Sequence, residues 1–504
     1  MVDDSELKGL LSSTILVFLG SIVASVSGLV ERIIIGRFLG PSDYGIISVG
    51  ITIFTLLSII SIFGLNQGIP RYISRYEETR KKRGVWVSAI AICISISILL
   101  VILANFFIQD LSRAFLQSSE YGRVLSVFVV AIPFYSGFRI SIAAIRGYEI
   151  TKYKTYTQDL IYPLGRIAIL LALLTLGYEL VAAGFAYFAS SLLVFVVSLY
   201  YANNVFSLFG PAERTTSKLL QFSFPLIVSS IIGILLTRTD TLMVGYFNTP
   251  ADVGQYSAAY PVAAGLQLVL SSFGFLYLPL ASKLDAKGRT NELNQVYQMT
   301  TRWIFIISLP ALVTFVVIPQ KTMVLLWGVE YQPAGVALSI LALGFFTNVM
   351  VGRNRETLSA LGETRHISYA NLLAFSVNVL LNIILVPRYS YVGAAVSSLI
   401  SFTILNIYVF TILFKNFRIT PFSKANAKTY AVLIAFVFPI GNLLSLTTES
   451  PLFSFLAVLF GSATFTVVLT LVAGLLQPED KLIIEMIESK IPLSLKTVKD
   501  QITE

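Results

Sequence analysis

The chain has 504 residues, of which 56% are hydrophobic and only 12% are charged, and its mean hydropathy is +0.80. A soluble globular protein carries about 25% charged residues, so this composition excludes an ordinary soluble domain. The single cysteine, Cys93, and the single histidine, His366, exclude disulfides within the chain and a His/Cys metal cluster. We therefore expect no metal and no cofactor.

Apolar segments of about 20 residues, the length that crosses a bilayer, recur from end to end of the chain. They predict an all-α, polytopic membrane protein. The expected spans number fourteen and lie at residues 10–38, 44–72, 85–108, 124–144, 155–176, 180–202, 219–247, 253–281, 303–319, 333–351, 366–386, 391–414, 425–446 and 452–475.

The net charge of +9 is distributed unevenly over the connections. The segment RYISRYEETRKKRG at 71–84 carries six Lys and Arg, and the other connections on its side and the two termini carry most of the rest. The opposite connections hold few: Arg37, Arg113, Arg123, Lys321 and Arg388. By the positive-inside rule, both termini are predicted to be cytoplasmic. The basic charge is thus an orientation signal, and no nucleic-acid partner is expected.

The two halves of the chain repeat each other. A shift of 209 residues places GRFLGPSDYGIIS (36–48) over GYFNTPADVGQYS (245–257), and a shift near 212 continues the match in the fifth and eleventh spans. We expect two six-helix lobes, 1–205 and 215–417, and then helices 13 and 14 at 425–476. Transporters built from parallel repeats bind cargo between the halves and alternate by rocking one against the other.

Three arginines lie deep within predicted spans and are candidate substrate-binding cations of a cavity: Arg139, Arg166 and Arg238. A charge at the bilayer centre costs about 2.5–3.5 kcal/mol, and a guanidinium binds phosphate bidentately. The alternative is interhelical ion pairing, for example of Arg166 with Asp159 or of Arg238 with Glu31. The candidate coupling or ion-pair acids are Asp240, Asp159 and Glu31.

Polar residues within the spans are candidate cavity lining. Two interrupt the second span and three recur on one face of the eleventh: Asn66, Gln67, Asn371, Asn378 and Asn382. Hydrogen bonds between helices explain either set equally well.

Enzyme signatures are missing from the sequence. There is no GxxxxGK[ST] phosphate-binding loop, and the outer-face acids are scattered over short connections. The tail at 477–504 opens with Pro478, Glu479 and Asp480 and is expected to form a cytoplasmic amphipathic helix on the membrane surface. We therefore expect a protein that is not an enzyme.

Three stretches together resemble one family. They are LGPSDYGIISVGITIFTLLSIISIFGLNQGIPRYISRY, TRTDTLMVGYFNTPADVGQYSAAY and ETLSALGETRHISYANLLAFSVNVLLNIILVPRYSYVGAAVSSLISF. The chain is similar over nearly its whole length to the polysaccharide-biosynthesis flippases of the multidrug/oligosaccharidyl-lipid/polysaccharide exporter superfamily. The resemblance implies a V-shaped pair of lobes around a cationic cavity, alternating access, and a place near that cavity for Arg238 of the TRTD motif.

The implied activity is export of an oligosaccharide on polyprenyl phosphate or pyrophosphate across a prokaryotic cytoplasmic membrane, for cell-surface polysaccharide or glycoprotein glycans. Membrane lipids surround the protein, and glycan polymerases or glycosyltransferases are candidate partners. The alternatives are a cation-coupled multidrug antiporter, a lipid II flippase and, from another class, a membrane enzyme of glycan assembly.

Overall fold

The computed structural model describes residues 4–480, with side chains from residue 19 onward except at 228, 229, 236, 275 and 276. Every regular element in the described part of the chain is helical, which confirms the predicted all-α class. The chain divides into two compact units, Met1–Ser257 and Ala258–Glu504. The lobe division at 205 and 215 stays a prediction.

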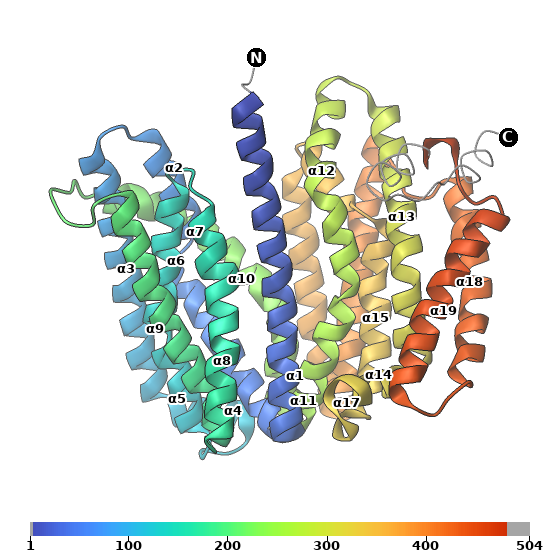
Figure 1. Ribbon diagram of the computed structural model, residues 1–504, viewed down its shortest axis with the longest axis horizontal. Coiled ribbons are helices and arrows are strands. Elements are labelled where there is room, and N and C mark those ends of the chain that lie inside the picture. The colour runs from blue at the N-terminus through green and yellow to red at the C-terminus, as the bar shows by residue number, and fades with distance from the viewer. Residues whose placement is uncertain (1–3, 481–504) are drawn as a thin grey trace. The chain divides into compact units, whose positions relative to one another are not determined.

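The first unit is built from long helices that pack side by side. Figure 1 shows α3, α6, α8 and α9 as such a layer, and α1 packs against α5, α6 and α10. The elements are α1 (Asp4–Ile62), α2 (Leu65–Arg75), α3 (Thr79–Phe106), α4 (Ile108–Leu116), α5 (Gly122–Val130), α6 (Ile132–Arg146), α7 (Lys152–Lys154), the π-helical η1 (Thr155–Ile161), α8 (Tyr162–Thr175), α9 (Glu179–Val205) and α10 (Thr216–Phe247).

The second unit has the same character, with α15 packed on α17 and α13 packed on α15, α18 and α19. Helix α11 (Pro250–Ala264) runs across the boundary between the units. The remaining elements are α12 (Leu266–Ala286), α13 (Thr290–Val317), α14 (Pro319–Trp327), the 3-10 turn η2 (Val329–Tyr331), α15 (Ala334–Val351), α16 (Asn354–Ala360), α17 (Thr364–Phe417), α18 (Lys424–Ser445), α19 (Pro451–Val472) and the 3-10 turn η3 (Pro478–Asp480).

Eleven helical segments in the described residues are long and apolar enough to cross a membrane. Two of them, Leu19–Arg75 and Thr364–Phe417, have 57 and 54 residues. At 1.5 Å per residue each is more than twice as long as a hydrocarbon core of about 30 Å. Both contain non-helical backbone where the sequence predicted a loop, at Gly40 (φ 78°) and Ser390 (φ 49°). The count of fourteen spans stays a prediction.

The sequence repeat has a structural counterpart in the first unit. A Cβ atom on Gly45 would lie 1.8 Å from the Pro250 carbonyl oxygen, and one on Gly254 would lie 1.9 Å from that of Pro41. The 209-residue shift relates Gly45 to Gly254 and Pro41 to Pro250. Each copy of the GxxxxPxDxG turn therefore contacts the other copy reciprocally, through a glycine in each that leaves room for backbone.

Candidate functional site

A buried ion pair joins α1 to α8 in the first unit. The Nη2 atom of Arg166 donates to Oε2 of Glu31, and the two residues are 9% and 2% exposed. The guanidinium carbon of Arg166 also lies 4.2 Å from the ring centroid of Tyr187 and 4.8 Å from that of Tyr162. A carboxylate and two aromatic faces thus compensate the charge of Arg166.

Arg166 thus pairs with Glu31 on another helix rather than with Asp159, the partner suggested by the sequence. Asp159 accepts a hydrogen bond from Nζ of Lys154 at 3.2 Å. The prediction assumed α-helical spacing between residues 159 and 166. Residues 155–161 instead form a π-helix, whose wider i→i+5 turn rotates Asp159 off the face that carries Arg166.

A polar pocket of about 340 Å³ lies inside the first unit, between α1, α2, α6 and α10. Phe54, Ile59, Ile62 and Gly64 form its apolar part. Its polar lining is one arginine, one amide and four hydroxyl groups: Arg139, Asn66, Thr55, Ser58, Tyr135 and Ser230. The pocket therefore joins two of the predicted site residues, Arg139 and Asn66, which are 73 positions apart in the chain.

Arg139 is the cation of this pocket. Its Nη1 donates to the Tyr135 hydroxyl oxygen at 3.1 Å, and its guanidinium carbon lies 5.8 Å from the centroid of that ring. Among the described residues, no carboxylate lies within ion-pair distance of Arg139. Arg166, by contrast, has a carboxylate partner in Glu31.

The remaining predicted charges lie on α10. Arg238 is half-buried there, close enough to the Tyr44 hydroxyl to act on it electrostatically, together with Arg32. Asp240 is 3% exposed and accepts a hydrogen bond from the hydroxyl of Tyr256. Arg238 and Asp240 are both absent from the lining of the polar pocket.

Of the five amide residues predicted to line a cavity, only Asn66 lines the polar pocket. Gln67 is exposed and does not line the pocket that contains Asn66. The other three are in the second unit: Asn371 is half-buried, whereas Nδ2 of buried Asn382 donates to Oδ1 of buried Asn378 at 3.0 Å. This last contact is a hydrogen bond along one helix.

Two features were missed from the sequence. The first is the hydroxyl lining of the pocket, of which Thr55 and Ser58 continue a helical series that begins at Ser48 and Thr52 and would have been a detectable signal. The second is a buried cluster in the second unit. Arg302 donates from Nη2 to Asp480 Oδ1 at 2.6 Å and from Nη1 to Asn426 Oδ1 at 3.1 Å, and Trp303 Nε1 donates to Asp480 Oδ1 at 2.8 Å.

The start of the predicted tail helix is a short 3-10 turn in which Pro478 and Glu479 are exposed and Asp480 points into the second unit. Asp480, in η3, is 0% exposed. The amphipathic helix expected after it lies outside the described residues.

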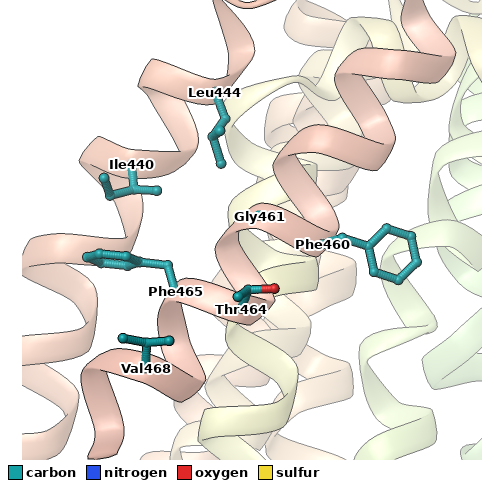
Figure 2. Close-up of a pocket in the computed structure, with 7 residues that line it drawn as sticks. All are labelled: Ile440, Leu444, Phe460, Gly461, Thr464, Phe465 and Val468. Atoms are coloured by element: carbon teal, nitrogen blue, oxygen red, sulfur yellow. The ribbon is translucent and has the colours of Figure 1, made fainter. Parts of the chain in front are cut away.

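A second cavity, of about 490 Å³, lies between α18 and α19. Figure 2 shows its lining, in which Ile440, Leu444, Phe465 and Val468 are apolar and Thr464 contributes a hydroxyl group. None of the described residues that line this cavity is charged, and Thr464 is the one among them with a polar side chain.

Long apolar helices around a polar, cationic pocket define a multi-pass membrane protein of transporter architecture. The protein belongs to the polysaccharide biosynthesis protein family, whose model matches residues 10–285. A second family model, MatE, matches residues 225–384.

Curated relatives include the probable low-salt glycan biosynthesis flippase Agl15 of Haloferax volcanii, which is 23% identical over 78% of this chain and 81% of its own. The succinoglycan biosynthesis transport protein ExoT of Rhizobium meliloti is 25% identical over 62% of this chain and 61% of its own. The fold is similar to that of the lipid II flippase MurJ in an inward closed conformation, with a TM-score of 0.73, 16% identity, and coverage of 91% of this chain and 99% of that one.

Proposed function

We propose that this protein is a flippase that moves an oligosaccharide on polyprenyl phosphate or pyrophosphate from the inner to the outer leaflet of a prokaryotic cytoplasmic membrane. The observation that carries the proposal is Arg139, a guanidinium without a carboxylate partner among the described residues, in a polar pocket within a membrane-spanning bundle. Family membership and the names of the relatives support the same activity.

The positive charge of Arg139 needs compensation within the membrane. A cation within a bilayer costs about 2.5–3.5 kcal/mol unless something offsets it. For Arg166 the offset is Glu31; for Arg139 we propose that it is the anionic cargo. The prenyl chain stays in lipid while the polar head passes through the protein by alternating access of two lobes. Arg238 is proposed as a further cation on that path.

The other roles follow from the same proposal. The protein is a transporter and not an enzyme, and both of its termini are cytoplasmic because the basic connections lie on their side. Glu31 is an ion-pair acid, which leaves Asp159 and Asp240 as candidates for coupling to an ion gradient. Asn371, Asn378 and Asn382 are proposed to support the second lobe. Glycan polymerases or glycosyltransferases acting outside would consume the product.

The test uses a strain that lacks this protein. Lipid-linked oligosaccharides are extracted, identified by mass spectrometry, and assigned to a leaflet with a membrane-impermeant label. We expect one cytoplasm-facing species to accumulate, and to be cleared by the wild type but not by Arg139→Gln or Arg238→Ala. Arg146→Gln is the matched control, because Arg146 is exposed on the same helix as Arg139. Unchanged lipid-linked species and surface glycans would contradict the proposal.

The second candidate is a cation-coupled multidrug antiporter, favoured by the MatE match. Its cavity would have to attract cationic drugs, whereas the described lining of the polar pocket contains an arginine and no acid. Drug sensitivity of the same strain, without lipid-linked accumulation, would favour the antiporter.

A further inference from the structure

We infer that the polar pocket of the first unit binds one sugar residue that carries a single carboxylate, with Arg139 on the carboxylate and Ser58 and Asn66 on the sugar hydroxyls. The inference rests on the proposed function and specifies the cargo class: a glycan that contains a uronic acid. It gives the pocket a role in selecting the glycan rather than in holding the lipid carrier.

The pocket contains hydrogen-bond donors that the protein leaves unused. The Ser58 hydroxyl is buried, with 1% of the residue exposed, and has no hydrogen-bond partner among the described residues. A buried polar group without a partner costs about 1–3 kcal/mol, and such groups in native proteins are nearly always satisfied. The Asn66 amide lines the same space, and the structure gives it no hydrogen bond within the described residues. Both groups are therefore available to a ligand.

Tyr135 orients the Arg139 side chain and uses only one of its N–H groups. Its contact with Tyr135 uses Nη1, and a guanidinium has five N–H donors in a planar fork. Two parallel N–H groups fit the two oxygens of a carboxylate. Because Tyr135 fixes the side chain, less conformational entropy is lost when the ligand binds.

The charge of the pocket selects a carboxylate over pyrophosphate. Among the described residues that line it, Arg139 is the one that is charged, and Arg166 is already paired with Glu31. A carboxylate brings one negative charge and is neutralised by one guanidinium. A pyrophosphate brings at least two, so an uncompensated negative charge would remain in a partly desolvated site.

The rest of the lining suits a sugar ring. The hydroxyls of Thr55 and Ser230 donate to the carbonyl oxygens of Ile51 and Leu226, at 2.7 and 2.9 Å, so their own oxygens face a ligand as acceptors. Ser58 and Asn66 supply donors. The volume of about 340 Å³ is at the small end of ligand pockets, about 300–1,000 Å³, and matches one sugar residue rather than a whole oligosaccharide.

The experiment measures binding to the full-length protein in detergent by saturation-transfer NMR titration. The probes are methyl β-D-glucuronide, its neutral counterpart methyl β-D-glucoside, and inorganic pyrophosphate. We expect the wild type to bind the glucuronide at least about tenfold more tightly than the glucoside, which corresponds to about 1.4 kcal/mol. Arg139→Gln should abolish this preference, and Arg146→Gln should retain it. Ser58→Ala should weaken both sugars and leave their ratio unchanged.

Equal affinities of the wild type for the two sugars would overturn the inference, and so would tighter binding of pyrophosphate than of glucuronide. The wild-type comparison needs no variant, so it remains decisive even where Arg139→Gln folds poorly. Binding and flipping are also separable. A protein that flips its cargo without preferring the glucuronide disproves the subsite alone, and one that prefers it without flipping disproves the proposed function alone.

Discussion

At the residue scale, the contrast between Arg166 and Arg139 shows how one residue type takes two roles in similar surroundings. Arg166 is bound by a carboxylate and two tyrosine rings, whereas Arg139 is bound by one tyrosine and borders a cavity. We therefore expect Arg166 to act on stability and Arg139 to act on cargo.

The buried pair predicts a coupled loss of stability. Arg166→Gln leaves the Glu31 carboxylate buried without its counter-charge, and removal of one partner of such a pair costs about 3–5 kcal/mol. We expect a lower thermal unfolding midpoint for the purified protein, and a smaller loss for the double variant Glu31→Gln/Arg166→Gln than the two single losses combined. An unchanged midpoint together with lost transport would instead make Arg166 a cavity cation.

The exposed pair of Arg113 with Asp110, at 3.6 Å and with side chains 65% and 68% exposed, is the control for this prediction. Its loss should cost no more than about 1 kcal/mol. Arg113→Gln should therefore leave the unfolding midpoint nearly unchanged.

The sequence could predict some of the buried charges but not how they are partnered. Depth within a span follows from residue spacing, and it identified Arg139 and Arg166, whereas Glu31 lies closer to the end of its predicted span. Partners depend on helix rotation, which the π-helix at 155–161 alters without a recognisable composition. The pocket itself is formed by α1, α2, α6 and α10, of which only α1 and α2 are neighbours in the chain, so the sequence could name its hydroxyl residues but not bring them together.

At the element scale, hydrogen bonds from and to α3 hold the connection between α9 and α10. Arg83 donates from Nε to the Ser207 carbonyl oxygen at 2.7 Å and from Nη1 to that of Pro211 at 2.9 Å. The Thr215 amide donates to the Ser88 hydroxyl at 3.0 Å. The connection at 206–215 is therefore an ordered part of the first unit.

Removing the Arg83 side chain should release this connection. Hydrogen bonds to charged groups contribute about 1.5–3 kcal/mol each, and about 1.4 kcal/mol is tenfold in an equilibrium. We expect Arg83→Gln to raise the rate of tryptic cleavage after Arg214 by at least about tenfold, since cleavage follows the population of the open form.

Arg80→Gln is the matched control, because Arg80 is exposed and contacts the connection through its backbone carbonyl oxygen, which accepts from the Glu213 amide at 3.2 Å. Its cleavage rate should equal that of the wild type. Equal rates for Arg83→Gln and Arg80→Gln would show that the arginine side chain does not hold the connection.

The positions of the helices were easier to predict from the sequence than the contacts between their side chains. Hydropathy predicts long apolar helices because a bilayer imposes both length and composition. It also predicted connections at 39–43 and 387–390, and the structure has non-helical backbone in both, at Gly40 and Ser390.

At the scale of the whole molecule, the sequence repeat becomes a symmetric contact. Gly45 approaches the Pro250 carbonyl oxygen and Gly254 approaches that of Pro41, so corresponding residues of the two copies exchange the same interaction. The repeat was visible in the sequence as an offset of 209 residues. The mutual contact was not, because an internal alignment relates residues without placing them side by side.

This symmetric contact predicts how substitutions of the two glycines affect stability, singly and together. An added methyl group on either glycine would lie less than 2 Å from a backbone oxygen, so the two turns must separate. We expect Gly45→Ala and Gly254→Ala each to lower stability by about 1–3 kcal/mol and to slow flipping. Because the first substitution already separates the turns, the double variant should lose less than the sum of the single losses.

Gly28→Ala is the control, because Gly28 is on α1 and no atom lies near the added methyl group. It should neither lower stability nor slow flipping. Thermal unfolding and the leaflet assay on all four variants check this, and strictly additive losses would mean that the two glycines do not share one contact.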